Sequence, residues 1–388
     1  MENFYITILY PYRASPMKSF RLKYEDTELY FGCNSVKNLK EYMKGMEHAI
    51  IATGSSSARK SGALADVENI IKECGVKFEV FDKIRPNPTV EIADKLAEMI
   101  LEKGSDCIIA IGGGSVIDTA KVSSIIALSG GRAGDYLRGK RGKRYLPLFV
   151  VNLTHGTGSE VDRYAVLTEG RNKVGISARY PNASFDDPRY LMSLPERQAI
   201  YTSVDAFFHA YEAVTGKFTN PFIETLSIEC VRLLRENLPR NQDLETKYNL
   251  LYASMIAGIS LDMGPAHIVH AIEHALSGMN HNLPHGCGLA IIGARSIYWI
   301  HRYAKNSKRI MEALIGKRIE SASEAEKSFK EFLEKVGFDE RLSDYGFGRD
   351  DFKERERIVF DELNYFFRRI EFDFKREMLR DILEKAYS

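Results

Sequence analysis

Histidines crowd into one short stretch of this 388-residue sequence. Five of the nine histidines fall within 19 consecutive residues: His267, His270, His274, His281 and His285. His270 and His274 are four residues apart in a stretch with a helical pattern, so their side chains share one helix face. Asp205 and His209 have the same spacing in the helical stretch SVDAFFHAYEAV. Because two ligands at positions i and i+4 of one helix can chelate one metal ion, these residues predict a metal site.

The donor atoms restrict the identity of that metal. Imidazole nitrogen and carboxylate oxygen suit Fe(II), Zn(II), Ni(II) or Mn(II), and ligand type does not choose among these four ions. An iron–sulfur cluster is not expected, because the five cysteines are scattered and never form a CxxC pair. The alternative is structural: Asp205 as a first-turn helix acid, and His270 or His274 as a hydrogen-bonded core residue. The metal site is favoured because a second functional motif occurs in the same chain.

That second motif is rich in glycine and lies between a strand and a helix. The apolar segment Cys107–Ile111 runs directly into Gly112–Ser115, and a helical pattern follows. A helix start presents unpaired N–H groups, and glycine lets a pyrophosphate approach them closely. The motif therefore indicates nucleotide binding; a tight turn that merely needs glycine is the alternative, since the spacing is not GxGxxG. Asp118 and Lys121, one turn apart in the following helix, would by themselves be an ordinary surface pair.

Two different architectures must position these motifs. Between about residues 31 and 151, strand-like segments (His48–Thr53, Phe78–Phe81, Cys107–Ile111, Leu146–Asn152) alternate with helical ones (Ser61–Cys74, Val90–Lys103, Val116–Leu128). Such alternation predicts a parallel sheet covered on both faces. From Pro195 onward one helical pattern follows another. We therefore expect an N-terminal α/β domain over residues 1–187 and an all-α domain over residues 188–388, with the boundary in a loop-like stretch near residues 183–193.

Bulk properties exclude several classes of protein. The formal net charge of +1 gives no support for a nucleic-acid partner. No apolar stretch approaches the roughly 20 residues that span a bilayer, and the first 16 residues do not resemble a signal peptide. Five scattered cysteines are typical of reduced thiols. We expect a cytoplasmic protein that acts on a small molecule, without a nucleic-acid or membrane partner.

Taken together, the motifs resemble those of the iron-containing (group III) alcohol dehydrogenase family, within the dehydroquinate synthase-like superfamily. The resemblance covers nearly the whole chain. It rests on five separated motifs in order: PNPT (86–89), GGGSVIDTAK (112–121), THGTGSE (154–160), SVDAFFHAYEAV (203–214) and HAIEHALSGMNHNLPHG (270–286). It implies a dinucleotide-binding α/β domain and a helical domain, with the active site in the cleft between them.

The resemblance also implies roles for single residues. The metal ligands would be Asp205, His209, His270 and His285, holding Fe(II) or, as the alternative, Zn(II). His274 would be the catalytic histidine beside the nicotinamide, where it could relay a proton or orient the ring. The pyrophosphate would lie against Gly113, Gly114 and Ser115. Further cofactor contacts would come from Asn87, Asp118, Thr154, Thr157 and Lys173. A homodimer is expected, as is common in the family.

The sequence departs from the family pattern at a few positions. Leu153 and Asp162 stand where many relatives have threonine, which affects the nicotinamide pocket. His281 lies inside a loop that is longer than in some relatives, so it could compete as a metal ligand. His267 has no role that the family implies, and its plain interpretation is a histidine at a helix start.

The choice between NADP(H) and NAD(H) depends on the segment after His48–Thr53. This segment, GSSSARK, contains no carboxylate that could bind the ribose hydroxyls of NAD. Ser55, Ser57 and Arg59 supply hydroxyls and a positive charge where a 2′-phosphate could lie, so we predict that NADP(H) is preferred over NAD(H). The alternative is a flexible turn with solvated cations. The basic run Arg138–Arg144 is most simply a solvated loop, and contact with a cofactor phosphate is the alternative.

The sequence thus predicts a metal-dependent NAD(P)(H) alcohol dehydrogenase or aldehyde reductase, in which hydride passes reversibly between nicotinamide C4 and a metal-bound alcohol or carbonyl. A polyol or hydroxy-acid dehydrogenase of the same family is the alternative. A dehydroquinate synthase-like lyase is less favoured, because few basic residues lie near the expected ligands. A silent nucleotide-binding protein is disfavoured, because all the expected ligands and His274 are present.

Overall fold

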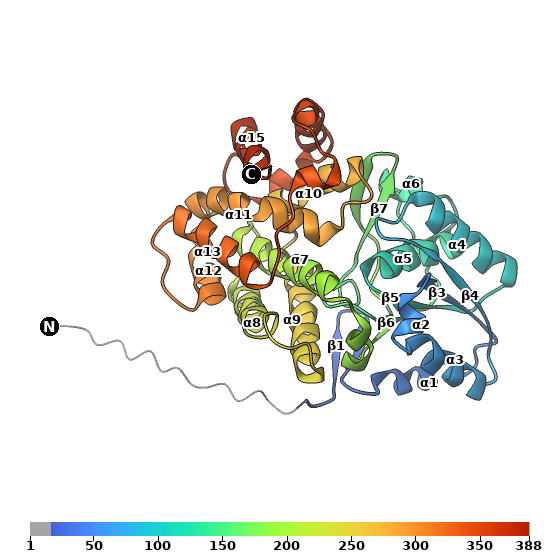
Figure 1. The fold of residues 1–388 in the computed structure, drawn as a ribbon. Helices are drawn as coiled ribbons and strands as arrows, with labels where there is room; N and C mark the ends of the chain where they lie inside the picture. The colour runs from blue at the N-terminus through green and yellow to red at the C-terminus, as the bar shows by residue number, and fades with distance from the viewer. Residues whose placement is uncertain (1–16, 388) are drawn as a thin grey trace.

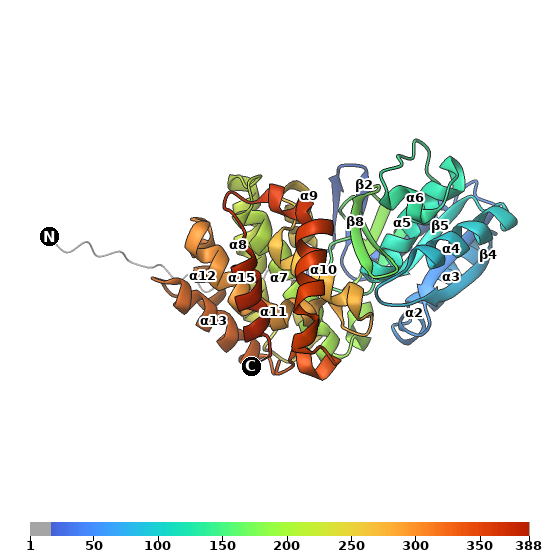
Figure 2. The ribbon, with the colours of Figure 1, turned by 90° about the horizontal axis from the view of Figure 1, so that it is seen from above.

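The computed structural model describes residues 17–387, which form an α/β lobe followed along the chain by a helical lobe (Figure 1). The N-terminal segment that does not resemble a signal peptide, residues 1–16, lies outside the described residues. The predicted fold class is confirmed. In Figure 2 the two lobes lie side by side, and the long helices of the second lobe pack around one another.

A seven-stranded sheet is the centre of the α/β lobe. Its strands are β1 (Phe20–Tyr24), β2 (Thr27–Phe31), β3 (His48–Gly54), β4 (Lys77–Ile84), β5 (Cys107–Gly112), β6 (Leu148–Asn152) and β9 (Ala183–Asp186). They lie in the order β1-β2-β9-β6-β5-β3-β4. All neighbouring strands are parallel except β1 and β2, which form an antiparallel hairpin.

Helices cover both faces of this sheet, as its uninterrupted apolar strands require. The helices of this lobe are α1 (Leu39–Tyr42), α2 (Ser57–Lys60), α3 (Ala63–Glu73), α4 (Val90–Lys103), α5 (Gly114–Ser129) and α6 (Ala133–Leu137), with a 3-10 turn η1 (Ser35–Asn38). Residues of α1 and α3 pack on the face that carries Ile109 and Ile111. Residues of α4 and α5 pack on the other face, with Ile108 and Ala110. The alternation along β5 therefore divides the core of this lobe into two layers.

The helical lobe is built around a buried central helix, α7 (Glu196–Thr215). The other helices are α8 (Pro221–Asn237), α9 (Leu244–Met263), α10 (Ile268–Met279), α11 (His285–Tyr303), α12 (Ser307–Ile315), α13 (Ala322–Lys335), α14 (Phe352–Arg357) and α15 (Arg376–Lys385). Short 3-10 or π segments are η2 (Pro188–Ser193), η3 (Leu342–Tyr345), η4 (Arg349–Asp351), η5 (Ile358–Glu362) and η6 (Asn364–Arg369). Because α8, α9 and α11 surround α7, this helix is buried from Tyr201 to Thr215.

One expectation was wrong: the first part of the stretch 183–193 is a strand and not a loop. Ala183–Asp186 is strand β9, which is fully buried between β2 and β6. Its polar residues suggested a loop, but the Ser184 hydroxyl donates to the Asp186 carboxylate over 2.9 Å within the core. Two hairpins were also not anticipated: β1–β2, and β7 (Tyr164–Glu169) with β8 (Asn172–Ser177). The β7–β8 hairpin packs on α5 and α10, so it joins the two lobes.

Among the described residues, no single helix is long and apolar enough to span a membrane. Helices α9 and α10 reach that length and composition only as a pair, which is bent by 103° at its break.

Candidate metal and dinucleotide site

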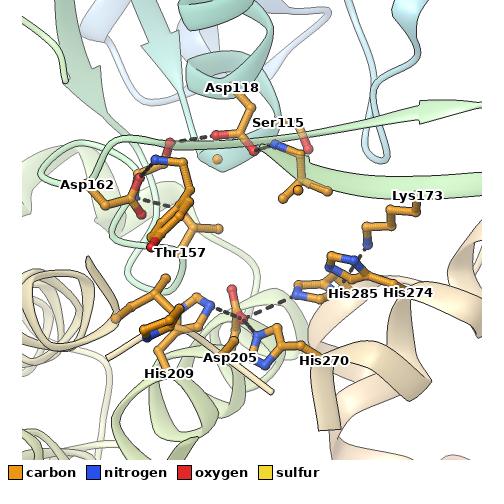
Figure 3. Close-up of a pocket in the computed structure, with 18 of the residues that line it drawn as sticks. Ser115, Asp118, Thr157, Asp162, Lys173, Asp205, His209, His270, His274 and His285 are labelled. Carbon is orange, nitrogen blue, oxygen red and sulfur yellow. Dashed lines mark hydrogen bonds and ion pairs between the residues drawn. The ribbon is translucent and has the colours of Figure 1, made fainter. Parts of the chain in front are cut away.

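One pocket between the two lobes gathers most of the predicted site residues (Figure 3). The α/β lobe contributes the start of α5, the loop after β6 and the β7–β8 hairpin. The helical lobe contributes α7, α10 and the first residue of α11. Apolar side chains complete the wall: Leu261, Pro265, Ala266, Tyr365 and Phe366. In Figure 3 the predicted metal ligands lie on the side of the pocket opposite Ser115, Asp118 and Thr157.

Four side chains from three helices converge on one point of this pocket. The Asp205 Oδ1 atom lies 3.4 Å from Nε2 of His209, 3.5 Å from Nε2 of His270 and 3.4 Å from Nε2 of His285. A tetrahedral metal site with bonds of about 2.1 Å has ligand atoms about 3.4 Å apart. In addition, Asp205 Oδ1 and His270 Nε2 are buried without a hydrogen-bond partner among residues 17–387. The donor set and its spacing therefore fit a divalent cation.

Each of the three imidazoles is oriented through its other ring nitrogen. The three Nδ1 partners are the Gly156 carbonyl for His209, at 3.3 Å, the Glu212 carboxylate for His270 and the Glu273 carboxylate for His285. An Nδ1–H that donates to such a group leaves Nε2 free and fixes the direction in which it points. The site therefore has the outer partners that metal-binding histidines usually have.

The two carboxylates stay ionised although they are fully buried. Burial raises the pKa of Glu212, but its contacts with the His267 and His270 imidazoles outweigh burial and hold the pKa below its usual range. Burial likewise raises the pKa of Glu273, and His285 and Lys173 outweigh it. Neither glutamate was predicted from the sequence. Glu212 lies two helical turns after Asp205, and Glu273 lies three residues, or about one turn, after His270. A carboxylate at such a spacing lies on the same helix face as the ligand, so this spacing could have identified both glutamates from the sequence.

His274 lies beside the four converging residues without sharing their focus. Its ring packs edge-on against Phe366, with centroids 5.5 Å apart, and its buried Nδ1 has no hydrogen-bond partner in the described part of the chain. Burial and the charge of Lys173 lower its pKa well below the ordinary value, so the imidazole is neutral near pH 7. A neutral imidazole that lines the pocket can accept a hydrogen bond at one ring nitrogen and donate one from the other.

The glycine-rich turn forms an open helix start. No side chain caps the first turn of α5. A Cβ atom on Gly113 would lie 2.7 Å from the Thr154 side chain, and one on Gly114 would lie 2.5 Å from that of Thr157. Glycine is therefore required for the loop after β6 to pack against the start of α5. Ser115 and Thr157 line the pocket beside these uncapped N–H groups, an arrangement that fits an anion such as a pyrophosphate.

Asp118 and Lys121 are not a surface pair. The Lys121 ammonium is completely buried, and four acceptors lie 2.7–2.9 Å from it: the Ser159 hydroxyl, the backbone carbonyl and one carboxylate oxygen of Asp162, and the Tyr164 carbonyl. Asp118 lines the pocket and accepts hydrogen bonds from the Ser159 hydroxyl and a backbone N–H of β7. Burial raises the pKa of Asp162 to about 7, although Lys121 opposes this. The unpredicted β7–β8 hairpin covers this side of α5, which explains the difference.

Asn87 and Lys173 line the pocket, but their hydrogen bonds run to the helical lobe and to each other. Asn87 Nδ2 donates to the carbonyls of His281 and Leu283, and Lys173 Nζ donates to Asn87 Oδ1. His281 itself has an exposed side chain and does not approach the four converging residues. His267 lies at the start of α10, as predicted from the sequence. Its Nδ1 caps the helix by accepting a hydrogen bond from the Ile268 N–H over 2.9 Å.

The residues predicted to choose between NADP(H) and NAD(H) lie apart from this pocket. Ser55, Ser57 and Arg59 are exposed around the start of α2, after β3. Arg59 Nη2 lies 3.9 Å from Asp82 Oδ2 on the neighbouring strand β4. The loop itself contains no carboxylate, but the adjacent strand supplies one, which the sequence pattern did not reveal. The run Arg138–Arg144 is mostly exposed, as predicted for a solvated loop, and lies at the far end of α5, where the Ser129 side chain bonds its backbone.

Comparison with known proteins identifies the family of the chain. A family model described as iron-containing alcohol dehydrogenase matches residues 26–188, and one described as Fe-containing alcohol dehydrogenase family, C-terminal, matches residues 199–387. The long-chain primary alcohol dehydrogenase of Thermoanaerobacter ethanolicus is 36% identical over 367 residues, which cover 89% of this chain and 92% of that protein.

Two further relatives extend the comparison. The NADPH-dependent butanol dehydrogenase of Clostridium saccharobutylicum is 27% identical, over 86% of this chain and 88% of that protein. A crystal structure of an archaeal halo-thermophilic alcohol dehydrogenase from a Red Sea brine pool superposes with a TM-score of 0.87 at 28% identity, covering 96% of this chain and 100% of that one. The chain therefore belongs to the iron-containing alcohol dehydrogenase family and is a metal- and NAD(P)-dependent alcohol dehydrogenase.

Proposed function

We propose that Asp205, His209, His270 and His285 hold the catalytic metal of this alcohol dehydrogenase, with Fe(II) as the working ion and Zn(II) as the alternative. The observation that carries the proposal is the approach of three Nε2 atoms to one Asp205 oxygen at 3.4–3.5 Å. A divalent metal there supplies a Lewis acid for the substrate oxygen. The donor set does not choose the ion, and zinc generally binds such ligands more tightly than ferrous iron.

The chain's own residues then position the two reactants. The uncapped start of α5, with Gly113, Gly114 and Ser115, would hold the pyrophosphate. Asp118, Thr154 and Thr157 would complete the cofactor wall between that turn and the metal ligands. His274 would relay the proton that the alcohol loses or orient the nicotinamide ring, because its neutral imidazole lines the same pocket.

The pocket wall supports an alcohol or aldehyde with an apolar chain as the substrate. Leu261, Pro265 and Phe366 line the same pocket as His274, whose ring packs against Phe366, and apolar side chains of this kind would help to keep water from the reacting atoms. A related protein is named a long-chain primary alcohol dehydrogenase. We propose reversible oxidation of primary alcohols with a hydrocarbon chain.

We propose further that NADP(H) is preferred over NAD(H). The cation Arg59 and the hydroxyls of Ser55 and Ser57 support this preference, because a 2′-phosphate needs donors and positive charge. Asp82 opposes it, since its carboxylate lies beside Arg59. Arg59→Ala should lower the NADP/NAD ratio of kcat/KM, and Asp82→Asn should raise it. An unchanged ratio in both variants would remove this loop from the choice of cofactor.

The assembly and location are proposed on less specific grounds. A homodimer is common in the family and is the commonest symmetric assembly. The five cysteines are all free, which supports a reducing compartment such as the cytoplasm. Sedimentation analysis of the purified protein tests the dimer directly.

The central experiment is metal reconstitution of protein purified without oxygen. The protein is stripped with chelator, and Fe(II), Zn(II), Ni(II) or Mn(II) is restored one at a time. NADPH oxidation is then followed with a series of straight-chain and aromatic aldehydes. We expect metal-dependent turnover in wild type and none in His285→Ala. His281→Ala is the matched control, because this exposed histidine lies in the preceding loop and should retain full activity. Turnover without any metal would contradict the proposed site.

A further inference from the structure

Asp162 places a carboxylate in the pocket at a position where many relatives have threonine. It lies in the loop between β6 and β7 and lines the pocket together with Asp118 and Thr157. Its side chain is 4% exposed. In Figure 3 it lies on the same side of the pocket as Ser115, and the proposed metal ligands lie on the other side. A charge on Asp162 therefore acts on a group bound between the glycine-rich turn and the metal site.

The two oxygens of this carboxylate have different partners. Oδ1 accepts from the Lys121 ammonium over 2.9 Å and from the Tyr164 N–H over 2.8 Å. Oδ2 accepts no hydrogen bond from the described residues. The partners of Oδ1 fix the orientation of the carboxylate, and Oδ2 remains available to a ligand in the pocket.

Lys121 does not cancel the negative charge of this region, because it lies between two carboxylates. The charged and titratable groups that face Asp162 are Lys121 and Asp118 on α5, Asp262 on α9, and Glu160 and Tyr164 beside it in the chain. Asp262 is paired with Arg163 at 3.0 Å. Burial raises the pKa of Glu160 well above its usual value, so Glu160 is neutral near pH 7. When Asp118 and Asp162 are ionised, they exceed the charge of Lys121, and this side of the pocket is negative.

The two forms of the cofactor differ in the charge that they bring to this pocket. The nicotinamide ring is cationic in the oxidised cofactor and neutral in the reduced cofactor. Hydride transfer requires the ring to lie between the glycine-rich turn and the metal ligands, in the part of the pocket that Asp162 lines.

We propose that the Asp162 carboxylate makes this site discriminate between the redox states of its cofactor, by favouring the cationic ring of the oxidised form over the neutral ring of the reduced form. The inference rests on the dinucleotide and metal sites proposed above. Opposite charges a few ångströms apart in a partly screened site change affinity by about tenfold. Tighter binding of the oxidised form also makes the bound reduced cofactor a stronger hydride donor.

The same interaction makes cofactor binding depend on pH. Burial raises the pKa of Asp162 to about 7, although Lys121 opposes this, so the carboxylate is ionised above pH 7 and protonated below it. The preference for the oxidised form should therefore be present above pH 7 and should be lost as the pH falls below it. By linkage, a cationic ring lowers the pKa of Asp162, so a tenfold effect means that binding of NADP⁺ near pH 7 releases roughly 0.4 of a proton. Binding of NADPH releases none from this group.

Asp162→Asn tests the proposal directly, because it keeps an acceptor for Lys121 and removes the charge. Dissociation constants of the oxidised and reduced forms are measured on metal-reconstituted protein without substrate, by the fluorescence of the reduced nicotinamide and by its displacement. Both NADP(H) and NAD(H) are used, so the result does not depend on which is preferred. Above pH 7 the ratio of the oxidised to the reduced dissociation constant should rise about tenfold in the variant. About two pH units below 7, wild type and variant should agree.

Two control variants and one measurement on wild type complete the test. Glu169→Gln removes a carboxylate from the far end of β7, away from the pocket, and should leave the ratio unchanged. Ser115→Ala should weaken both forms alike. Calorimetry in buffers of different ionisation enthalpy counts the protons that wild type releases. This measurement needs no substitution, so it decides the question even if Asp162→Asn does not fold.

The outcomes separate the role of Asp162 from the proposed site. If wild type binds neither form of either cofactor, the proposed dinucleotide site is wrong. If both forms bind, but the ratio is the same in Asp162→Asn and wild type releases no proton with NADP⁺, the role of Asp162 is wrong while the site stands. A ratio that falls in Asp162→Asn would also overturn the role of Asp162.

Discussion

Two carboxylate–imidazole pairs support the proposed metal site, and they differ in what supports them. Glu212 lies on α7, the helix that also carries Asp205 and His209. Beyond His270, its carboxylate accepts from the Val269 N–H over 2.7 Å and contacts His267 Nδ1 at 3.0 Å, so all these partners lie in the helical lobe.

The pair Glu273–His285 depends on the other lobe. Lys173 of strand β8 neutralises Glu273, and Asn87 holds the loop before His285. The side chain of His270 is 4% exposed, whereas that of His285 is 24% exposed. One half of the site is thus organised by the packing of a single lobe, and the other half by the contact between lobes. A metal site at a domain boundary can therefore report whether the two domains are correctly docked.

The largest expected effect comes from removing the atom that the two halves share. Asp205→Ala deletes the oxygen that all three imidazoles approach, so both halves lose their common partner. We expect activity to fall below detection and metal affinity to fall by more than about 100-fold, the upper end for an outer partner. Metal analysis after gel filtration measures retention. A variant that kept its metal would show that the three histidines suffice.

The next effect separates the two carboxylates. Glu212→Gln and Glu273→Gln should each weaken metal binding by about 10–100-fold, because each imidazole loses a charged acceptor. Only Glu212→Gln should also disturb the start of α10, where Glu212 accepts from Val269. Hydrogen exchange at the first turn of α10 measures this difference. Equal hydrogen-exchange rates in both variants would contradict the claim that Glu212, unlike Glu273, supports the start of α10.

A double-mutant cycle sharpens the comparison further. Lys173→Met combined with Glu273→Gln should show a coupling energy of about 1–3 kcal/mol in unfolding, because these buried partners share one ion pair. The same cycle with Glu212→Gln should give less than about 0.5 kcal/mol, since no hydrogen bond or ion pair joins Lys173 to Glu212 among the described residues. Urea unfolding of the metal-free proteins supplies the energies. Similar couplings would mean that the two pairs are not independent.

The smallest effect concerns His267, which contacts only one of the two pairs, Glu212–His270. Its Nδ1 caps α10 and its Nε2 lies 3.0 Å from the Thr215 hydroxyl. His267→Ala should lower the free energy of unfolding by about 1 kcal/mol, the usual effect of losing a helix cap. His267→Asn, which retains a capping oxygen, should recover most of it. Circular dichroism during thermal unfolding measures both variants.

The sequence reveals the parts of this site that are local and misses those that depend on the tertiary fold. Asp205 and His209 lie one helical turn apart, as do His270 and His274, so their spacing identified them as candidate site residues. The glycine-rich turn was visible for the same reason. The burial of Lys121 could not be predicted from local spacing, because it depends on the β7–β8 hairpin, which begins more than 40 residues later in the chain.

Family resemblance located Asn87 and Lys173 in the pocket but could not give their partners. Asn87 bonds a loop almost 200 residues away, and no pattern of spacing encodes that distance. Strand β9 was missed because its polar residues Ser184 and Asp186 satisfy each other inside the core. Interactions that form between distant segments therefore account for most of what the sequence left open.

The position of β9 also constrains the order in which the protein can assemble during synthesis. Strand β2 pairs only with β1 and β9 in the sheet, and β9 lies some 150 residues later in the chain. Until the ribosome has released Ala183–Asp186, the first hairpin has no edge to join and β6 keeps an unpaired edge. An exposed edge of this kind favours pairing with other chains. Nascent chains that end before β9 should therefore bind chaperones. Once β9 has emerged from the ribosome and paired with β2 and β6, the chaperones should dissociate.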